Sequence, residues 1–194
     1  LLRRLRQTMA GLQTLLIDSP GEPLQEPEHA LQSLMGAQPR APLGLDVRPD
    51  WLANVQFTSG TTGLPKGCML SHRYWTQLGC LIADELVELG PQDVMLTAQP
   101  FSYIDPQWNV AAMLASGASL VVLERFSPSG FWPKVAAHGV SFFYCLGAMP
   151  TLLLAQPPSP AERAHRLRVV MCSGIPCDRH AELEERFGVA WREV

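Results

Sequence analysis

The sequence has 194 residues, of which 47% are apolar and 17% charged, with a formal net charge of −3. This balance is typical of a globular chain and excludes an intrinsically disordered one, and it provides no basic field for nucleic acid. The most apolar stretch, VSFFYCLGAMPTLLLA, is interrupted by Gly147 and Pro150 and is shorter than the ~20 residues of a membrane-spanning helix.

Residues 1–50 form a poorly defined N-terminal segment that ends in a linker-like stretch, AQPRAPLGLDVRPD. The pattern sharpens from Trp51 onward, so we expect residues 51–194 to be the central part of one domain. The chain begins with Leu and stops inside the apolar segment VAWREV, where a buried strand is expected to begin. We therefore interpret it as a fragment of a longer protein.

Two strands and a long helix are predicted first. LANVQFT and GCMLSH have the composition of strands on either side of a polar loop, and Ser71 is placed to cap a helix. Apolar residues then recur at helical spacing until Gly90 and Pro91 end the run. They are Tyr74, Leu78, Ile82 and Leu86.

The rest of the chain alternates between the two kinds of element. Strands are predicted over 94–98, 119–124, 140–145 and 167–172, because each is a short apolar run. Helices are predicted at about 107–116, from Ser127 and Pro128 onward, at 150–156 and at 178–188. This alternation predicts an α/β fold with a mainly parallel sheet that is covered by helices.

The polar loop, TSGTTGLPKG at residues 58–67, has the chemistry of a phosphate site. Its glycines let the backbone approach a ligand closely, its hydroxyls can donate hydrogen bonds, and its lysine adds a positive charge. The residues are Thr58, Ser59, Gly60, Thr61, Thr62, Gly63, Lys66 and Gly67. An ordinary hairpin turn is the alternative.

This loop differs from a Walker loop, in which G-x-x-x-x-G-K is followed by Ser or Thr and a helix. Here Pro65 precedes Lys66, Gly67 follows it, and the next segment is a predicted strand. No helix N-terminus is therefore aimed at the phosphates. We expect the loop to bind with its side chains and its own turns.

FTSGTTGLPKGCMLSH resembles the phosphate-binding motif of the adenylate-forming superfamily, which includes acyl-CoA synthetases and peptide-synthetase adenylation domains. Residues 101–154 are similar to the family's acyl-site region. MCSGIPCDRHAELEERFG resembles the segment whose turn lies against adenine, here Gly174, Ile175 and Pro176. The run LLAQPPSPAERAHRLRVVM is most similar to the carnitine/crotonobetaine CoA ligase branch.

The resemblance implies a two-step reaction. A carboxylic acid attacks ATP, with Mg²⁺, to give an acyl-adenylate and pyrophosphate, and a thiol such as CoA then takes the acyl group. Lys66 and Thr58 would act in catalysis, with residues 58–62 holding the β and γ phosphates. The family's Tyr-Gly-x-Thr-Glu element is expected after Val194, so we expect the isolated chain to lack turnover.

The acyl site is the least defined part of the prediction. Tyr103 stands where many acyl-CoA synthetases have histidine, and either lines the acyl pocket or packs. Ile104 stands where amino-acid-activating members place aspartate, which disfavours an α-amino acid substrate. Tyr103, Asp105 and Trp108 could form an aromatic and anionic wall for a quaternary ammonium group. Alternatively, Asp105 caps the next helix ahead of Pro106.

The remaining candidate groups point to no further chemistry. Five cysteines, at 68, 80, 145, 172 and 177, form no C-x-x-C pair and are predicted to be ordinary thiols in a cytoplasmic protein. The five histidines lack metal-ligand spacing, so no protein metal site is predicted. The expected partners are a small carboxylic acid, ATP and CoA, without nucleic acid.

Two other functions remain open. One is a peptide-synthetase or aryl-acid adenylation domain, which the sequence after Val194 would distinguish. The other is a non-catalytic nucleotide-binding or interaction module.

Overall fold

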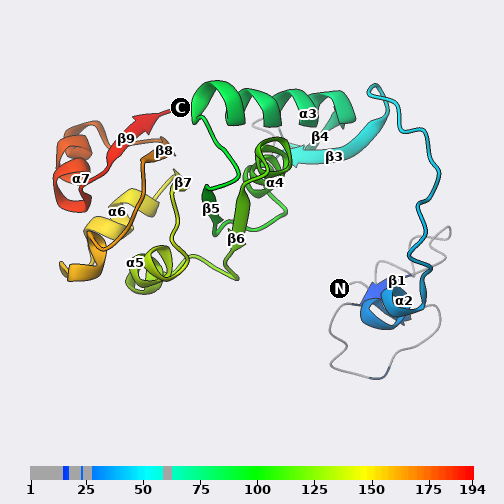
Figure 1. Ribbon diagram of the computed structural model, residues 1–194, viewed down its shortest axis with the longest axis horizontal. Coiled ribbons are helices and arrows are strands. Elements are labelled where there is room, and N and C mark those ends of the chain that lie inside the picture. Colours follow the sequence, from blue (N-terminus) through cyan, green and yellow to red (C-terminus); the bar gives the residue numbers. More distant parts are fainter. Residues whose placement is uncertain (1–14, 18–22, 24–27, 59–62) are drawn as a thin grey trace. The chain divides into compact units, whose positions relative to one another are not determined.

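The computed structural model describes residues 15–17, 23, 28–58 and 63–194. The chain divides into two compact units, residues 1–46 and 47–194. In the first unit, strand β1 (Leu15–Ile17) pairs in parallel with β2 (Glu28–Ala30), and helix α2 (Leu31–Ala37) follows directly (Figure 1). The predicted site residues all belong to the second unit.

The second unit begins with an antiparallel hairpin of β3 (Leu52–Thr58) and β4 (Lys66–Ser71). Helix α3 (His72–Cys80) follows, and its N-cap is Ser71, whose Oγ accepts a hydrogen bond from the Tyr74 N–H at 3.2 Å. The cap is therefore the predicted one. The chain then continues as a π-helical segment, η1 (Leu81–Leu86), so the predicted apolar stripe runs through two kinds of helix.

The main sheet has five parallel strands in the order β6-β5-β7-β8-β9. The strands are β5 (Val94–Thr97), β6 (Ser119–Val122), β7 (Phe142–Leu146), β8 (Val169–Ser173) and β9 (Ala190–Glu193). The connecting helices are α4 (Ile104–Ser116), α5 (Pro128–Ala137), α6 (Met149–Leu154), η2 (Pro160–Glu162), η3 (Cys177–Arg179) and α7 (His180–Phe187). The α/β fold and the parallel sheet are confirmed.

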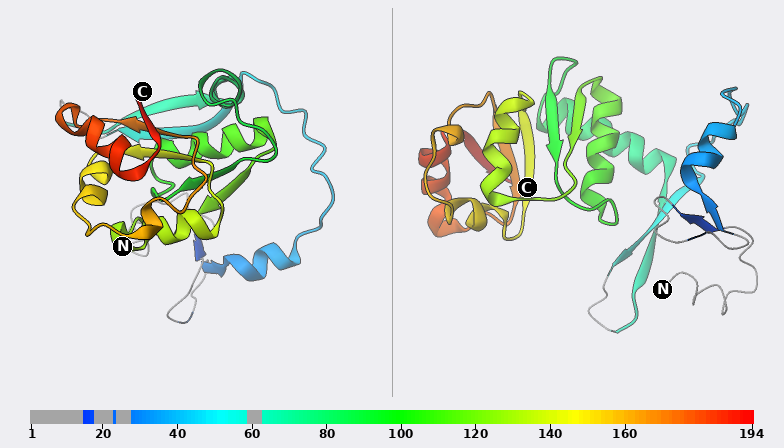
Figure 2. Two further views of the ribbon diagram at one scale, coloured as in Figure 1. Left: turned by 60° about the vertical axis from the view of Figure 1, so that its left-hand side comes forward. Right: turned by 90° about the horizontal axis from the view of Figure 1, so that it is seen from below.

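Successive side chains of the central strands enter two different cores, because strand residues alternate between the faces of a sheet. Phe142 of β7 packs with α3, η1 and α4, whereas its neighbour Phe143 packs with α5, α6 and α7. The pairs Met95/Leu96 and Val169/Val170 divide in the same way. Helices therefore cover both faces of the sheet, as the right-hand view of Figure 2 shows.

Helix α4 begins three residues earlier than its apolar pattern predicts. It starts at Ile104, with Tyr103 at the N-cap position and Pro106 in the first turn, where proline costs no intrahelical hydrogen bond. Asp105 is inside this first turn, so its predicted alternative role as the helix cap is wrong. A carboxylate there still interacts favourably with the positive end of the helix.

Candidate functional site

The predicted phosphate loop joins the two strands of the β3–β4 hairpin. Thr58 and Lys66 are the last register pair before the loop, and both side chains are exposed. Gly63 has φ +119°, a backbone conformation that favours glycine. The predicted residues Ser59, Gly60, Thr61 and Thr62 lie outside the described residues. As expected, a strand rather than a helix follows the loop.

Gly67 has a packing reason within the hairpin. It pairs with Phe57, and a Cβ atom at this position would lie 2.9 Å from Val55 Cγ1 and 3.4 Å from Phe57 Cε1. Real Cβ atoms almost never come within 3.0 Å of a neighbour, so any side chain here would displace Val55. The glycine next to Lys66 therefore keeps the end of β4 close to β3.

A chain of side-chain amides connects this hairpin to α4, and the sequence did not predict it. Gln107 Oε1 accepts a hydrogen bond from Asn54 Nδ2 at 2.9 Å, and Gln107 Nε2 donates to Gln56 Oε1 at 2.9 Å. Gln107 Nε2 also lies 3.0 Å from the carbonyl oxygens of Phe101 and Tyr103. The hairpin strand is thus bonded to the start of the predicted acyl site.

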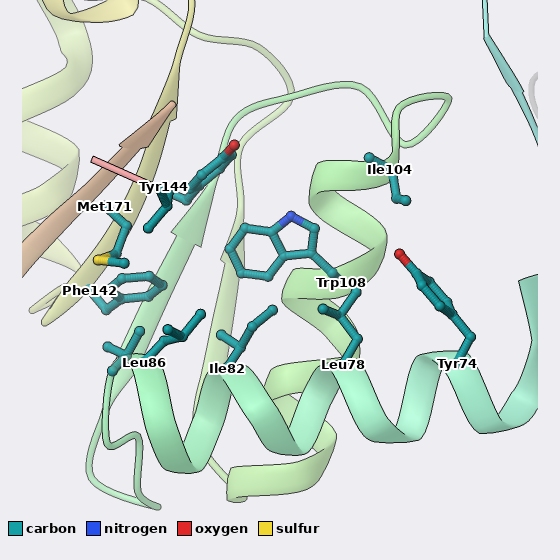
Figure 3. A pocket seen from close by; sticks show the side chains of 11 residues that line it. Tyr74, Leu78, Ile82, Leu86, Ile104, Trp108, Phe142, Tyr144 and Met171 are labelled. Atoms are coloured by element: carbon teal, nitrogen blue, oxygen red, sulfur yellow. The ribbon is translucent and has the colours of Figure 1, made fainter. Parts of the chain in front are cut away.

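An apolar cavity of about 340 Å³ opens beside the N-terminal half of α4 (Figure 3). Its lining comes from three layers: Tyr74, Leu78, Ile82 and Leu86 on α3 and η1; Ile104 and Trp108 on α4; and Phe142, Tyr144 and Met171 on the sheet. Of the three predicted substrate residues, Trp108 alone lines this cavity. The side chain of Tyr103 is 61% exposed.

Tyr144 brings a polar group to the cavity wall. The Trp108 and Tyr144 rings pack edge to face, with centroids 4.9 Å apart. Burial, together with the nearby Asp105 carboxylate, raises the pKa of Tyr144 to about 12, so the phenol stays protonated at neutral pH. The Asp105 carboxylate therefore lies near the Tyr144 phenol. Only the strand register, and not a motif, could have identified Tyr144.

The predicted adenine turn follows β8. Gly174 has φ +92°, which explains why glycine occupies this position. The Glu193 carboxylate at the end of β9 accepts hydrogen bonds from the backbone N–H groups of Gly174 and Ile175, both at 2.8 Å. These two bonds hold the pKa of Glu193 below its usual value. Glu193 was not predicted, because it is 19 residues from Gly174 in the sequence.

These groups share one edge of the sheet. Helix α4 follows β5, Tyr144 is near the end of β7, the Gly174 turn follows β8, and Glu193 ends β9. Ligands of open parallel sheets bind outside the carboxyl ends of the strands. The arrangement therefore favours an elongated ligand with an apolar part in the cavity and another part at the turn.

A magnesium ion is implied by the resemblance to adenylate-forming enzymes. Within the described ranges, no group of three or more His, Cys, Asp or Glu side chains is placed to hold a metal ion. A magnesium ion that binds together with ATP usually takes one or two protein carboxylates and completes its coordination with phosphate oxygens and water. Among the helices that the structure describes, none is both long and apolar enough to cross a membrane.

Comparison with known proteins gives consistent matches. The family model of the AMP-binding enzymes matches residues 2–193. The crotonobetaine/carnitine–CoA ligase of Shigella sonnei is 37% identical over 148 residues, which cover 72% of this chain and 27% of that protein. A medium/long-chain-fatty-acid–CoA ligase of Mycobacterium tuberculosis is 33% identical over 135 residues, which cover 69% of this chain and 23% of that protein. The chain thus spans about a quarter of the length of these relatives.

Solved structures show the same fold. The o-succinylbenzoate CoA synthetase of Bacillus subtilis, solved with ATP and magnesium, has a TM-score of 0.74 at 23% identity, and the match covers 97% of this chain and 40% of that one. ATP-bound MatB of Rhodopseudomonas palustris has a TM-score of 0.71 at 24% identity, covering 84% of this chain and 33% of that one.

Proposed function

Because the chain belongs to the family of AMP-binding enzymes, we propose that the protein activates a carboxylic acid with ATP and transfers the acyl group to CoA. The observation that carries this proposal is the hairpin, in which exposed Thr58 and Lys66 face each other on either side of the glycine- and hydroxyl-rich loop. A hydroxyl and a cation at that point suit the terminal phosphates of ATP.

In the first step, a carboxylate oxygen of the acid attacks the α-phosphorus of ATP. The bond from that phosphorus to the bridging oxygen breaks, and pyrophosphate leaves with the electron pair. Lys66 stabilises the negative charge that develops on the leaving group, and Thr58 donates a hydrogen bond to it. Charge-assisted hydrogen bonds of this kind contribute roughly 1.5–3 kcal/mol each.

In the second step, the thiol sulfur attacks the acyl carbonyl carbon and gives up its proton. The bond from that carbon to the phosphate oxygen breaks, and AMP leaves with the electron pair. Two features of the described chain serve the adenylate. The Gly174–Pro176 turn lies against adenine in this proposal, while the apolar cavity holds the acyl chain. Exclusion of water from that cavity protects a reactive mixed anhydride from hydrolysis.

The cavity favours an acid with an apolar acyl chain, because aliphatic and aromatic side chains form most of its wall. A quaternary ammonium acid such as carnitine is the second candidate. It is favoured by the Trp108 ring, which can bind a cation through its face, and by the Asp105 carboxylate near Tyr144. In this second case Tyr103, exposed at the N-cap of α4, would contact a part of the acid that lies outside the cavity.

Carboxylate-dependent ATP–pyrophosphate exchange on the intact protein tests the proposal. We expect exchange with medium-chain fatty acids. If carnitine-type acids are the substrates instead, Asp105→Asn should lower the exchange rate, and otherwise it should not. The chain has two lysines, so Lys134→Met, on the exposed side of α5, is a matched control for Lys66→Met. Lys66→Met should lower exchange by about 10²- to 10³-fold, the usual cost of removing one transition-state donor.

The outcomes separate the alternatives. Exchange with an aryl acid or an amino acid in place of a fatty acid would favour an adenylation domain of the peptide-synthetase or aryl-acid type. Nucleotide binding without exchange for any acid in a broad panel would favour a non-catalytic nucleotide-binding module and refute the ligase. Equal loss in the Lys66 and Lys134 variants would remove the hairpin from the mechanism.

A further inference from the structure

The amides between β3 and α4 form a single directional chain. The Trp75 indole Nε1–H donates to Asn54 Oδ1 at 2.8 Å, and Asn54 Nδ2 donates to Gln107 Oε1 at 2.9 Å. Gln107 Nε2 donates to Gln56 Oε1 at 2.9 Å, and Gln56 Nε2 donates to the Ser102 carbonyl oxygen at 2.8 Å. The chain joins α3, β3, α4 and the segment before α4.

The direction of this chain is fixed at both ends. The indole nitrogen of Trp75 can only donate, and the Ser102 carbonyl can only accept. Each amide between them must therefore present its oxygen toward Trp75 and its nitrogen toward Ser102. Gln107 holds the central place, because the two N–H groups of its Nε2 are shared among three acceptors: Gln56 Oε1 and the carbonyl oxygens of Phe101 and Tyr103, the last two at 3.0 Å.

The position of this series of hydrogen bonds is more informative about function than its contribution to stability. Asn54 and Gln56 are the half-buried residues of β3, whereas Val55 and Phe57 are exposed. The inward face of this strand is thus held by directional hydrogen bonds rather than by apolar packing alone, and such bonds specify one register and one distance. Thr58 is two residues beyond Gln56 on the same strand.

The other end of the chain reaches the acyl cavity. Gln107 is next to Trp108, which lines the cavity. The side-chain amide of Gln107 donates hydrogen bonds to the backbone carbonyl oxygens on both sides of Ser102. We propose, on the basis of the proposed function, that Gln107 is a positioning residue. It fixes the position of the β3–β4 hairpin, which carries the phosphate loop, relative to the acyl site. It thereby aligns the carboxylate of the acid with the α-phosphorus of ATP.

Alignment of two reactants is a large part of such a reaction, and a misplacement of about 1 Å can cost 10²-fold in rate. Loss of the Gln107 contacts should therefore lower kcat while each substrate still binds. A residue with a purely structural role would instead lower the stability of the protein, and activity would fall with the folded fraction.

Four variants of the intact protein test this, one of them Trp75→Phe. Gln107→Leu removes every bond of the side chain. Gln107→Glu keeps an acceptor for Asn54. Its second oxygen would face Gln56 Oε1 and two carbonyl oxygens, so this variant should lower kcat at least as much as Gln107→Leu does. Gln77→Leu, an exposed glutamine on α3, is the matched control.

The measurements are kcat and both KM values in ATP–pyrophosphate exchange, direct binding of AMP, thermal unfolding, and hydrogen exchange of the hairpin. We expect Gln107→Leu to lower kcat by about 10²-fold, with AMP binding within about threefold of the parent and faster hydrogen exchange in β3. Trp75→Phe, which removes the first donor of the chain but keeps a ring, should lower kcat less and in the same direction.

The proposal is overturned if Gln107→Leu keeps kcat within about twofold of an active parent, or if kcat falls only in proportion to the folded fraction. A failure of the proposed function is distinct from this, because the unsubstituted protein would then show no carboxylate-dependent exchange with any acid. If that protein shows no exchange but Gln107→Leu still has faster hydrogen exchange in β3, the Gln107 bonds stabilise the structure only. That result also contradicts a positioning role.

Discussion

Thr58 and Lys66 form the last register pair of the β3–β4 ladder, so their side chains project from the same face of the hairpin at the mouth of the phosphate loop. The phosphate loop connects these two residues. The pair presents one hydroxyl and one cation to whatever the loop binds. If both contact the same phosphate group, their effects on binding are not independent.

Thr58→Val tests this pairing, because valine keeps the branched shape and removes the hydroxyl. We expect kcat/KM for ATP to fall by up to about tenfold, the equivalent of one hydrogen bond of roughly 0.5–1.5 kcal/mol. Thr58→Ser should stay near the parent. In the double variant with Lys66→Met, the two losses should not add, since neighbouring groups in one network couple. Full additivity in ATP–pyrophosphate exchange would contradict a shared phosphate.

Helices α3 and α4 pack closely against each other at Gly79. A Cβ atom at Gly79 would lie 2.6 Å from the Ala111 carbonyl oxygen, which belongs to the backbone and cannot rotate away. Gly79→Ala should therefore force the helices apart and lower the free energy of unfolding by about 1–3 kcal/mol, as overpacking does. Urea denaturation measures this change.

Gly90→Ala is the matched control, because nothing lies within 4 Å of a Cβ atom there and its φ is not positive. We expect a change within about 0.5 kcal/mol. Equal destabilisation by the two substitutions would mean that the α3–α4 contact is looser than described. Since α4 also carries Trp108 and Gln107, Gly79→Ala should lower activity as well.

The Glu193 bonds to the Gly174 turn predict a pH dependence. The N–H groups of Gly174 and then Ile175 lower the pKa of Glu193 in the folded protein. The stabilising contribution is therefore complete above the unfolded pKa, near the ordinary glutamate value of about 4.3, and is lost as pH falls through the lower folded pKa.

Glu193→Gln should remove this dependence, because an amide does not ionise, and it should also lose one hydrogen bond, because its NH2 group cannot accept from an N–H. The melting temperature of the variant should lie below that of the parent at neutral pH, and the difference should shrink as the parent carboxylate becomes protonated. Glu185→Gln, on the exposed side of α7, is the control. A difference that stays constant with pH would show that Glu193 does not act through its charge.

The sequence predicted the fold because local patterns are decisive there. Apolar runs of strand length, the Ser71 cap and the Gly67–Lys66 end of the loop each restrict the backbone without help from distant residues. The change from α3 to the π-helical η1 was not predictable, since residues 74, 78, 82 and 86 suit either helix. The start of α4 was misplaced because its apolar pattern begins after Pro106.

The site could be predicted only where one short segment carries it. The phosphate loop and the Gly174 turn are each contiguous in sequence. The composition of the loop was sufficient to propose it, whereas the turn was proposed from its resemblance to a segment of the adenylate-forming superfamily. Tyr144, Glu193 and Gln107 take their roles from partners on other elements, and Gln107 is 53 residues from Asn54. Such contacts depend on sheet order and helix packing, which no local pattern encodes. Tyr103 shows the converse: it belongs to the predicted segment, but its side chain is largely exposed.

The five cysteines divide into two classes that a labelling experiment can separate. Cys68, Cys80 and Cys177 are exposed, whereas Cys145 and Cys172 are buried and pair directly across β7 and β8. Burial, together with the neighbouring Cys172 thiol, raises the pKa of Cys145, which suppresses the reactive thiolate. We therefore expect an alkylating reagent to modify the three exposed thiols of the native protein and to reach the other two only after unfolding.

Peptide-resolved mass spectrometry measures this, with labelling in urea as the reference for full access. The two buried thiols should react at least 10²-fold more slowly than Cys177, because their exposure requires an opening of the central sheet, which costs several kcal/mol. The same experiment on Gly79→Ala shows whether a loosened α3–α4 contact changes the labelling of Cys145. The contact and this cysteine lie on opposite faces of the sheet. Labelling of Cys145 at the rate of Cys177 would contradict the description of β7 and β8 as the centre of the fold.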